Sequence, residues 1–186
     1  MPSKKNFNLH IDTNCDNEVN TEIVHCDTCG VKIDEPNDEH IKKHAYLIIP
    51  HLYLGNIWNA KNSVELSKLN IHTIINMTYE MKNYYPTDYY YINYPWHDWL
   101  GYQILNDLDN ICDQINKLIT QKCNVLVHCK MGISRSVTVI LAYLIKYNKM
   151  SFTEAHEYVK SIKDSICPND TFVDDLIIFS KNTNIQ

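Results

Sequence analysis

The stretch that decides the fold is Val125-Leu126-Val127-His128-Cys129-Lys130-Met131-Gly132-Ile133-Ser134-Arg135-Ser136. The apolar residues at its start predict a buried strand, a loop with a glycine follows, and the apolar-periodic run after the loop predicts a helix. A strand–loop–helix joint aims backbone N–H groups and the positive end of the helix at one point, which makes it an anion site. Cys129 lies at the mouth of this loop and Arg135 at its far end.

The segments around this joint predict alternating strands and helices. Short apolar or β-prone runs predict strands at residues 46–50, 51–55, 72–77 and 89–94. A helix or irregular helical segment is expected up to Asn70, beginning near Trp58. Apolar residues at three-and-four spacing predict helices at 105–119, 137–145 (apolar on one face), 152–162 and 172–179. This order predicts an α/β fold with a central, mainly parallel sheet flanked by helices.

Length and composition exclude several classes of protein. The 186 residues suit one domain with a modest appendage, and a net charge of −5 without a basic block argues against a nucleic-acid binder. The polar start, with Pro2 at the position where myristoylation needs glycine, gives no sign of secretion or lipidation. No apolar stretch approaches the ~20 residues that span a bilayer. We therefore expect a cytoplasmic protein, with the nucleus as a second compartment.

The N-terminal extension, residues 1–44, carries a metal-ligand pattern. Its residues 1–24 are polar and asparagine-rich, and we expect them to be mostly disordered. Cys26, Cys29, His40 and His44 then form C-x2-C-x10-H-x3-H, slightly shorter than the usual zinc-finger spacing. Thiolates and imidazoles favour zinc, so a structural zinc site is one interpretation. The other is two free cysteines and two solvated histidines in a tail.

The main domain is expected from residue 45 to residue 186, and its charge pattern singles out one side chain. Arg135 is the only arginine, against sixteen lysines. Lysine is a point charge, whereas a guanidinium group is a planar fork that binds two phosphate oxygens at once. The position of the single arginine in the glycine loop therefore favours phosphate as the anion.

The loop also supplies a nucleophile. A helix N-terminus and a cation both favour the thiolate form of a cysteine, so Cys129 is expected to attack phosphorus, and an inert buried thiol is the alternative. Ser136 is expected to hydrogen-bond the sulfur, and His128 to orient the loop. The backbone N–H groups expected to hold the phosphoryl oxygens are those of Lys130, Met131, Gly132, Ile133, Ser134 and Arg135.

These residues resemble a known signature. His128-Cys129-x-x-Gly132-x-x-Arg135-Ser136 is similar to the motif of the cysteine-based protein phosphatases. Ile133-Ser134-Arg135-Ser136 resembles the mitogen-activated-kinase phosphatases, and Cys129-Lys130-Met131-Gly132 resembles the slingshot type. Leu52-Tyr53-Leu54-Gly55-Asn56 and Pro168-Asn169 resemble two further motifs of the dual-specificity branch. The resemblance, which runs from about residue 45 to 180, implies a cysteine-phosphatase-like fold and catalysis without a cofactor.

The resemblance also implies a general acid about thirty residues before the cysteine, where Asp98 lies. Chemistry requires such a group independently, because an alkoxide leaves poorly unless it is protonated, and general acid catalysis contributes ~10²–10⁴ in rate. Asp88, Asp107 and Asp109 are the rival acids, and two of these lie in a predicted helix. His97 is expected to face the substrate at most.

Three functions remain to be weighed. The leading one is hydrolysis of phosphotyrosine and phosphoserine or phosphothreonine in proteins through a phosphocysteine intermediate. Protein kinases are among the expected phosphoprotein substrates. The small domain favours this function, since tyrosine-specific relatives carry a larger domain with an aromatic recognition loop. The alternative enzyme is a phosphatase of phosphoinositides or other non-protein phosphomonoesters, which usually has more basic residues in the loop than Lys130 and Arg135. A binding module that lacks activity, or a zinc adaptor, is disfavoured because cysteine, arginine and acid are all present.

Overall fold

The computed structural model describes residues 24–30, 32–33 and 44–183. Its centre is a five-stranded sheet of order β3-β4-β7-β5-β6. The strands are β3 Tyr46–Ile49, β4 Leu52–Gly55, β5 Ile71–Asn76, β6 Tyr90–Asn93 and β7 Asn124–His128. Strands β4, β7, β5 and β6 run parallel, while β3 pairs antiparallel with β4 at one edge, so the predicted mainly parallel sheet is confirmed.

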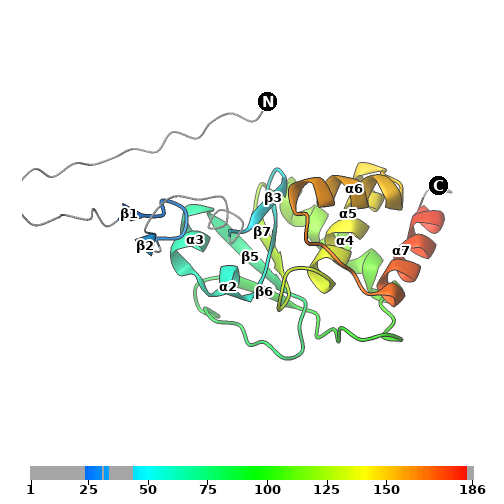
Figure 1. Cartoon of the computed structure of the whole chain (residues 1–186), viewed down its shortest axis with the longest axis horizontal. Helices are drawn as coiled ribbons and strands as arrows, with labels where there is room; N and C mark the ends of the chain where they lie inside the picture. The colour runs from blue at the N-terminus through cyan, green and yellow to red at the C-terminus, as the bar shows by residue number, and fades with distance from the viewer. Residues whose placement is uncertain (1–23, 31, 34–43, 184–186) are drawn as a thin grey trace, which may run out of the picture.

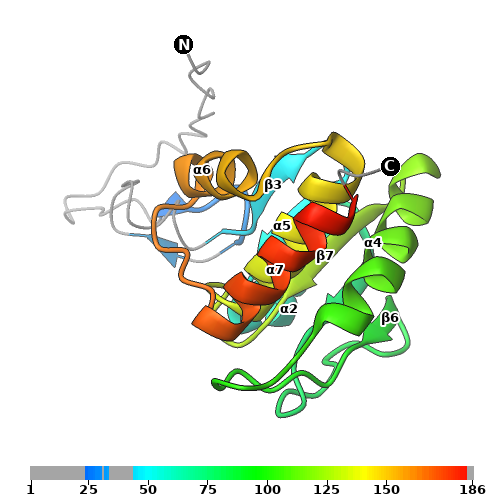
Figure 2. The same ribbon diagram turned by 90° about the vertical axis from the view of Figure 1, so that its right-hand side faces the viewer.

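The helices form layers on both faces of the sheet. They are α2 Ile57–Lys61, α3 Ser63–Lys68, α4 Leu105–Thr120, α5 Arg135–Asn148, α6 Phe152–Ile162 and α7 Asp170–Thr183. Figure 1 shows α4 to α7 on one side of the sheet, with α2 and α3 on the other. In Figure 2, α7 lies in front of α5, and α4 runs beside them.

The main core lies between the sheet and α4 to α7, and a smaller one lies under α2 and α3. Helix α5 differs from the prediction of one apolar face, because its residues are buried continuously from Arg135 to Ile145. The reason is its position, since it packs against the sheet and also against α4, α6 and α7. A helix enclosed in this way is buried on all sides rather than along one stripe. Its first residues are therefore held rigidly at the end of the glycine loop.

Two other segments differ from the predictions or lie partly outside the description. The helical segment up to Asn70 is two short helices, because Asn62 ends α2 and its side chain caps α3 by accepting from the Glu65 N–H. In the extension, β1 Val24–His25 pairs antiparallel with β2 Lys32–Ile33. The disorder predicted for residues 1–24 falls on residues of which only Val24 is described. The boundary at residues 44 and 45 stays a prediction.

Within the described ranges, no helix combines the length and the apolar character that a membrane crossing requires.

Candidate active site

The loop after β7 is shaped by one close backbone contact. Gly132 has φ +70°, a conformation that favours glycine, and a Cβ at this position would lie 2.8 Å from the carbonyl oxygen of Gly55. The Ile57 N–H also donates to the Lys130 carbonyl at 3.2 Å. Since Gly55 ends β4 and Ile57 begins α2, the neighbouring strand and helix hold the loop on one side.

Cys129 lies at the bottom of this loop and is 1% exposed. Its Sγ accepts a hydrogen bond from the Gly132 N–H at 3.2 Å and another from the Ser136 hydroxyl at 3.2 Å. Both donors stabilise negative charge on the sulfur. The predicted contact between Ser136 and the sulfur is therefore present, and the arrangement suits a nucleophilic thiolate that later becomes a leaving group.

Arg135 is held by a carboxylate that the sequence analysis did not identify. Its Nη1 donates to Glu80 Oε2 and its Nη2 to Glu80 Oε1, both at 2.8 Å. Nη1 also donates to the Trp96 carbonyl at 3.1 Å. Burial lowers the pKa of Arg135, but its hydrogen bonds to Glu80 and the nearby negative groups outweigh this, and its pKa lies above the ordinary value. The guanidinium is therefore charged and fixed in orientation.

The remaining donors of Arg135 have the geometry that phosphate requires. A guanidinium group has five N–H donors, and Glu80 and Trp96 use three of them. The other two, on Nε and Nη2, lie on the same edge of the group and can bind two oxygens together. Nε is buried and has no hydrogen-bond partner among the described residues, although it lies 3.6 Å from Asp98 Oδ2. This edge is the natural place for a phosphoryl group.

Asp98 is brought to the same loop from a different segment. Its Oδ1 accepts hydrogen bonds from the Ser134 hydroxyl at 2.7 Å and from Asn169 Nδ2 at 2.9 Å. The rival acids are engaged elsewhere: Asp107 accepts from the Trp96 indole at 2.8 Å, and Asp109 pairs with Lys146 at 2.6 Å. Asp88 accepts from the hydroxyl of Thr87 at 3.2 Å. Asp98 alone of these four contacts the described parts of the glycine loop.

The segment that carries Asp98, residues 94–104 (the acid segment), is attached to three helices. Trp96 is buried and joins α4 through Asp107 and α5 through Arg135. The Gly101 N–H donates to the Thr171 hydroxyl and the Ile104 N–H to Asp175, both at 2.8 Å and both on α7. Asp98 is therefore carried on a closely held support.

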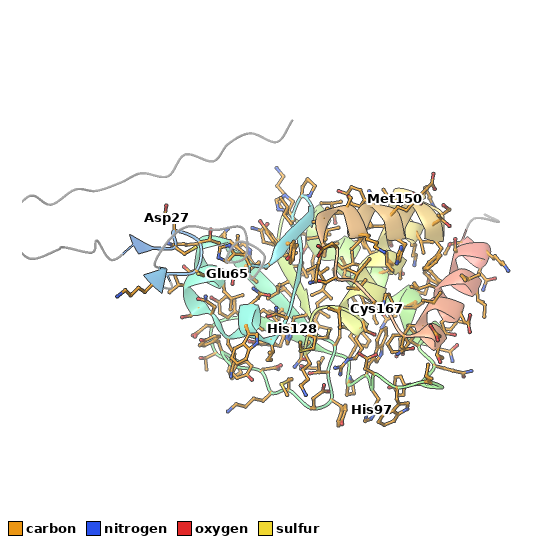
Figure 3. The ribbon with its side chains drawn as sticks, in the orientation of Figure 1. Asp27, Glu65, His97, His128, Met150 and Cys167 are labelled. Atoms are coloured by element: carbon orange, nitrogen blue, oxygen red, sulfur yellow. The ribbon has the colours of Figure 1, made fainter. Side chains whose placement is uncertain are left out.

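The two histidines near the site have different surroundings. His128 is 1% exposed, and its Nδ1 lies 3.3 Å from the Cys129 carbonyl. Burial and, to a smaller extent, the charge of Arg135 lower the pKa of His128 to about 4, although its hydrogen bond with the Cys129 carbonyl raises it, so the ring is neutral at pH 7 and suited to orienting the loop. His97 packs between the rings of Tyr79 at 3.9 Å and Trp99 at 4.0 Å. Figure 3 shows His128 inside the molecule and His97 at its lower edge.

Sequence reasoning missed Glu80 and the contact of Asn169 with Asp98. A signal for Glu80 existed, because it follows β5, and the carboxyl ends of the parallel strands β5 and β7 meet at one edge of the sheet. In the sequence, Asn169 stands out only as part of the Pro168-Asn169 motif. Its second role depends on α7 folding back onto the loop, where its Oδ1 also accepts from the Phe172 N–H at 3.0 Å.

The described part of the extension contains a group of potential metal ligands. The ligand atoms of Cys26, Cys29 and His44 all lie within 4.8 Å of one another. The group could hold a metal ion. His40, the fourth predicted ligand, lies outside the described residues.

Comparison with known proteins agrees with this geometry. A family model described as "Dual specificity phosphatase, catalytic domain" matches residues 52–182. Dual specificity protein phosphatase 18 of Mus musculus is 35% identical over 158 residues, which are 82% of each chain. The chain belongs to the dual specificity phosphatase family, whose catalysis does not depend on a cofactor.

Other relatives are longer proteins. Protein phosphatase Slingshot of Drosophila melanogaster is 38% identical over 133 residues, which cover 72% of this chain and 13% of that protein. Dual specificity protein phosphatase 9 of Homo sapiens is 34% identical over 141 residues, which cover 75% of this chain and 37% of that protein. The chain thus matches a small part of these two relatives.

Solved structures show the same fold. DUSP15 has a TM-score of 0.70 and 27% identity, over 74% of this chain and 88% of that one. A mouse putative dual specificity phosphatase has a TM-score of 0.73 and 25% identity, over 76% of this chain and 89% of that one.

Proposed function

We propose that this chain hydrolyses phosphotyrosine and phosphoserine or phosphothreonine in proteins through a phosphocysteine at Cys129. One observation carries the proposal: the loop that activates the Cys129 sulfur also presents the free edge of Arg135 beside Asp98. Nucleophile, phosphate clamp and acid thus surround one point.

The first step transfers the phosphoryl group to sulfur. The Cys129 thiolate attacks phosphorus, an S–P bond forms, and the bond from phosphorus to the ester oxygen breaks. Protonated Asp98 gives its proton to that oxygen, which leaves as the side-chain hydroxyl of the substrate. Arg135 and the loop N–H groups hold the charged phosphoryl oxygens throughout.

The second step regenerates the enzyme. The Asp98 carboxylate takes a proton from water, the water oxygen attacks phosphorus, and the S–P bond breaks to release inorganic phosphate. The hydroxyl of Ser136, 3.2 Å from the sulfur, stabilises the departing thiolate. The chemistry needs no metal.

Protein substrates suit the rim of the site. Apolar side chains stand exposed beside the loop and the acid segment: Met131 is 60% exposed, Tyr79 56% and Trp99 53%. Such a rim can contact residues that flank a phosphorylated side chain. We therefore include phosphoproteins, with protein kinases among them, as partners, and the cytoplasm and nucleus as the compartments where these occur.

Two measurements test the proposal. Rapid-quench labelling with a phosphopeptide should trap phosphate on Cys129, and Cys129→Ser should remove both label and turnover. Persisting turnover in this variant would refute the covalent mechanism. The alternative, a phosphoinositide phosphatase, is tested by assaying phosphopeptides and soluble inositol phosphates side by side, and a clear preference for the latter would overturn the protein assignment.

The metal-ligand group receives a separate proposal. We propose that Cys26, Cys29 and His44 bind a structural zinc ion, since thiolates and imidazoles are the donor types of structural zinc sites.

A further inference from the structure

The separation of the Cys26 and His44 donor atoms fits a zinc centre. Cys26 Sγ and His44 Nε2 lie 3.3 Å apart. Zinc bound tetrahedrally at about 2.3 Å from sulfur and about 2.0–2.1 Å from nitrogen sets these two atoms about 3.5 Å apart. The Gly30 N–H donates to the Cys26 carbonyl at 2.8 Å and closes the turn between the cysteines, with Gly30 at φ +72°. Both cysteines are buried, 8% and 6% exposed.

This knuckle, residues 26–30, packs on α3. Asn62 Nδ2 donates to the Cys29 carbonyl at 3.2 Å, and Lys68 Nζ donates to the Asp27 carbonyl. Gly30 lies against Val64, since a Cβ there would be 3.2 Å from Val64 Cγ1. The contacts reach the cap, the first turn and the last turn of α3. Figure 1 shows the β1–β2 hairpin beside α3, and Figure 3 places Asp27 and Glu65 at this end of the molecule.

The residue after His44 is hydrogen-bonded to the buried carboxylate of Glu65. Ala45 directly follows His44, and its N–H donates to Glu65 Oε1 at 2.6 Å. Glu65 is 2% exposed, and its two carboxyl oxygens also accept from Asn59 Nδ2 at 3.3 and 3.2 Å. Since a buried carboxyl group that loses a partner is costly, this set is expected to form or open together.

The same set continues to the phosphate loop. Asn59 Oδ1 accepts from the Asn56 N–H at 2.8 Å, which fixes the start of α2. The next residue, Ile57, donates its N–H to the Lys130 carbonyl at 3.2 Å. From His44, the connection therefore passes through Ala45, Glu65, Asn59 and the start of α2 to the loop that holds Cys129.

We infer that the metal centre of Cys26, Cys29 and His44 holds the extension against α3. Through Glu65, it also stabilises the phosphate loop. The hairpin has only two residues per strand, too few for stability without further support. Metal binding supplies that support, because the free energy of binding becomes free energy of folding. Loss of the ion should release the knuckle from α3 and loosen α2, α3 and the loop.

Metal content of the full chain tests the first half. It is measured in a Cys129→Ser background, so that the nucleophile cannot bind metal. One zinc per chain is expected, with loss in Cys26→Ser and Cys29→Ser and retention in Cys123→Ser, a control cysteine outside the ligand group. Cobalt should give thiolate-to-metal absorption that both knuckle variants remove. Equal metal in the knuckle variants and the control would overturn the site.

Amide hydrogen exchange tests the second half and does not depend on phosphatase activity. Removing zinc from the Cys129→Ser chain should speed exchange at residues 55–69 and 130–134 by about tenfold or more, with adding zinc back restoring it and α7 unchanged. Glu65→Gln should keep the zinc and still speed exchange at 130–134. Unchanged exchange at 130–134 on zinc removal would refute the link to the loop and leave the zinc site standing. If a knuckle variant fails to fold, the chelation and add-back arms on the intact chain still decide.

Discussion

Glu80 accepts hydrogen bonds from both terminal nitrogens of the Arg135 guanidinium group, with Nη1 and Nη2 each 2.8 Å from a carboxylate oxygen. Burial raises the pKa of Glu80, but its hydrogen bonds to Arg135 and the charges of Arg135 and Lys130 outweigh burial, so its pKa lies below the ordinary value. The carboxylate is therefore ionised across the neutral range and fixes the guanidinium with its free edge, at Nε, 3.6 Å from Asp98 Oδ2.

Glu80→Gln should lower kcat/KM for a phosphopeptide by about tenfold, which corresponds to ~1.4 kcal/mol of transition-state stabilisation. An amide accepts through one oxygen only, so the guanidinium loses one hydrogen bond and its fixed orientation. Steady-state kinetics check this, with Glu157→Gln on the exposed face of α6 as control. A wild-type kcat/KM in Glu80→Gln would show that Arg135 needs no such support.

Asp98→Asn should lower kcat by ~10²–10⁴ for alkyl phosphates such as phosphoserine, because the amide cannot protonate the leaving oxygen. The loss should be much smaller for p-nitrophenyl phosphate, whose leaving group is already a good one. Comparing the two substrates separates lost acid catalysis from lost binding. An equal loss for both would assign Asp98 to binding instead.

Asn169 caps α7 and also contacts Asp98, and two variants can separate these roles. Asn169→Ala should cost about 1 kcal/mol of stability, because it removes the cap of α7, and should lower kcat by freeing Asp98. Asn169→Asp should keep the cap and so lose less stability than Asn169→Ala, yet still lower kcat, since a carboxylate cannot donate to Asp98 and repels it. Urea unfolding and steady-state kinetics measure the two effects. If Asn169→Asp were fully active, the contact with Asp98 would have no role in turnover.

His128 should make stability depend on pH. Its pKa falls from 6.5 when the chain is unfolded to about 4 in the fold. Between these values the unfolded chain binds a proton that the native chain does not, so stability falls as the pH drops from 6.5 toward 4, by up to about 3 kcal/mol. Urea unfolding at pH 7.5, 5.5 and 4.5 measures this.

The control for His128 is a comparison of variants. His128→Gln should lose this part of the pH dependence, while His156→Gln on α6 should keep it. A slope that survives in His128→Gln would assign the effect to other groups.

Local patterns predicted most of the fold. The helix predicted at residues 152–162 is present, and it begins at a capping box in which the Ser151 N–H donates to Glu154 at 2.8 Å. The strand ending at His128 and the helix after the loop were predictable, because the spacing of apolar residues along a short stretch of chain indicates both the type of element and its burial. The break at Asn62 was missed, because one asparagine both ends a helix and caps the next, and apolar spacing does not reveal this.

The site was predictable only in part. Cys129, Ser136 and Arg135 share one loop, so their spacing alone indicates a common role. Asp98 was predicted from resemblance and from chemical need, and the structure places it beside Arg135. Glu80 acts on Arg135 from fifty-five positions away in the chain, and only the pairing of β5 with β7 brings them together. Partners joined by topology leave little trace in a single sequence.

The anchoring of the acid segment has a kinetic consequence. Trp96, Gly101 and Ile104 are tied to α4, α5 and α7 on either side of Asp98. A segment held at so many points is expected to move less than the lids of many enzymes, which close over a bound substrate. We therefore expect Asp98 to be in place before a substrate binds, so that turnover does not wait for this segment to close.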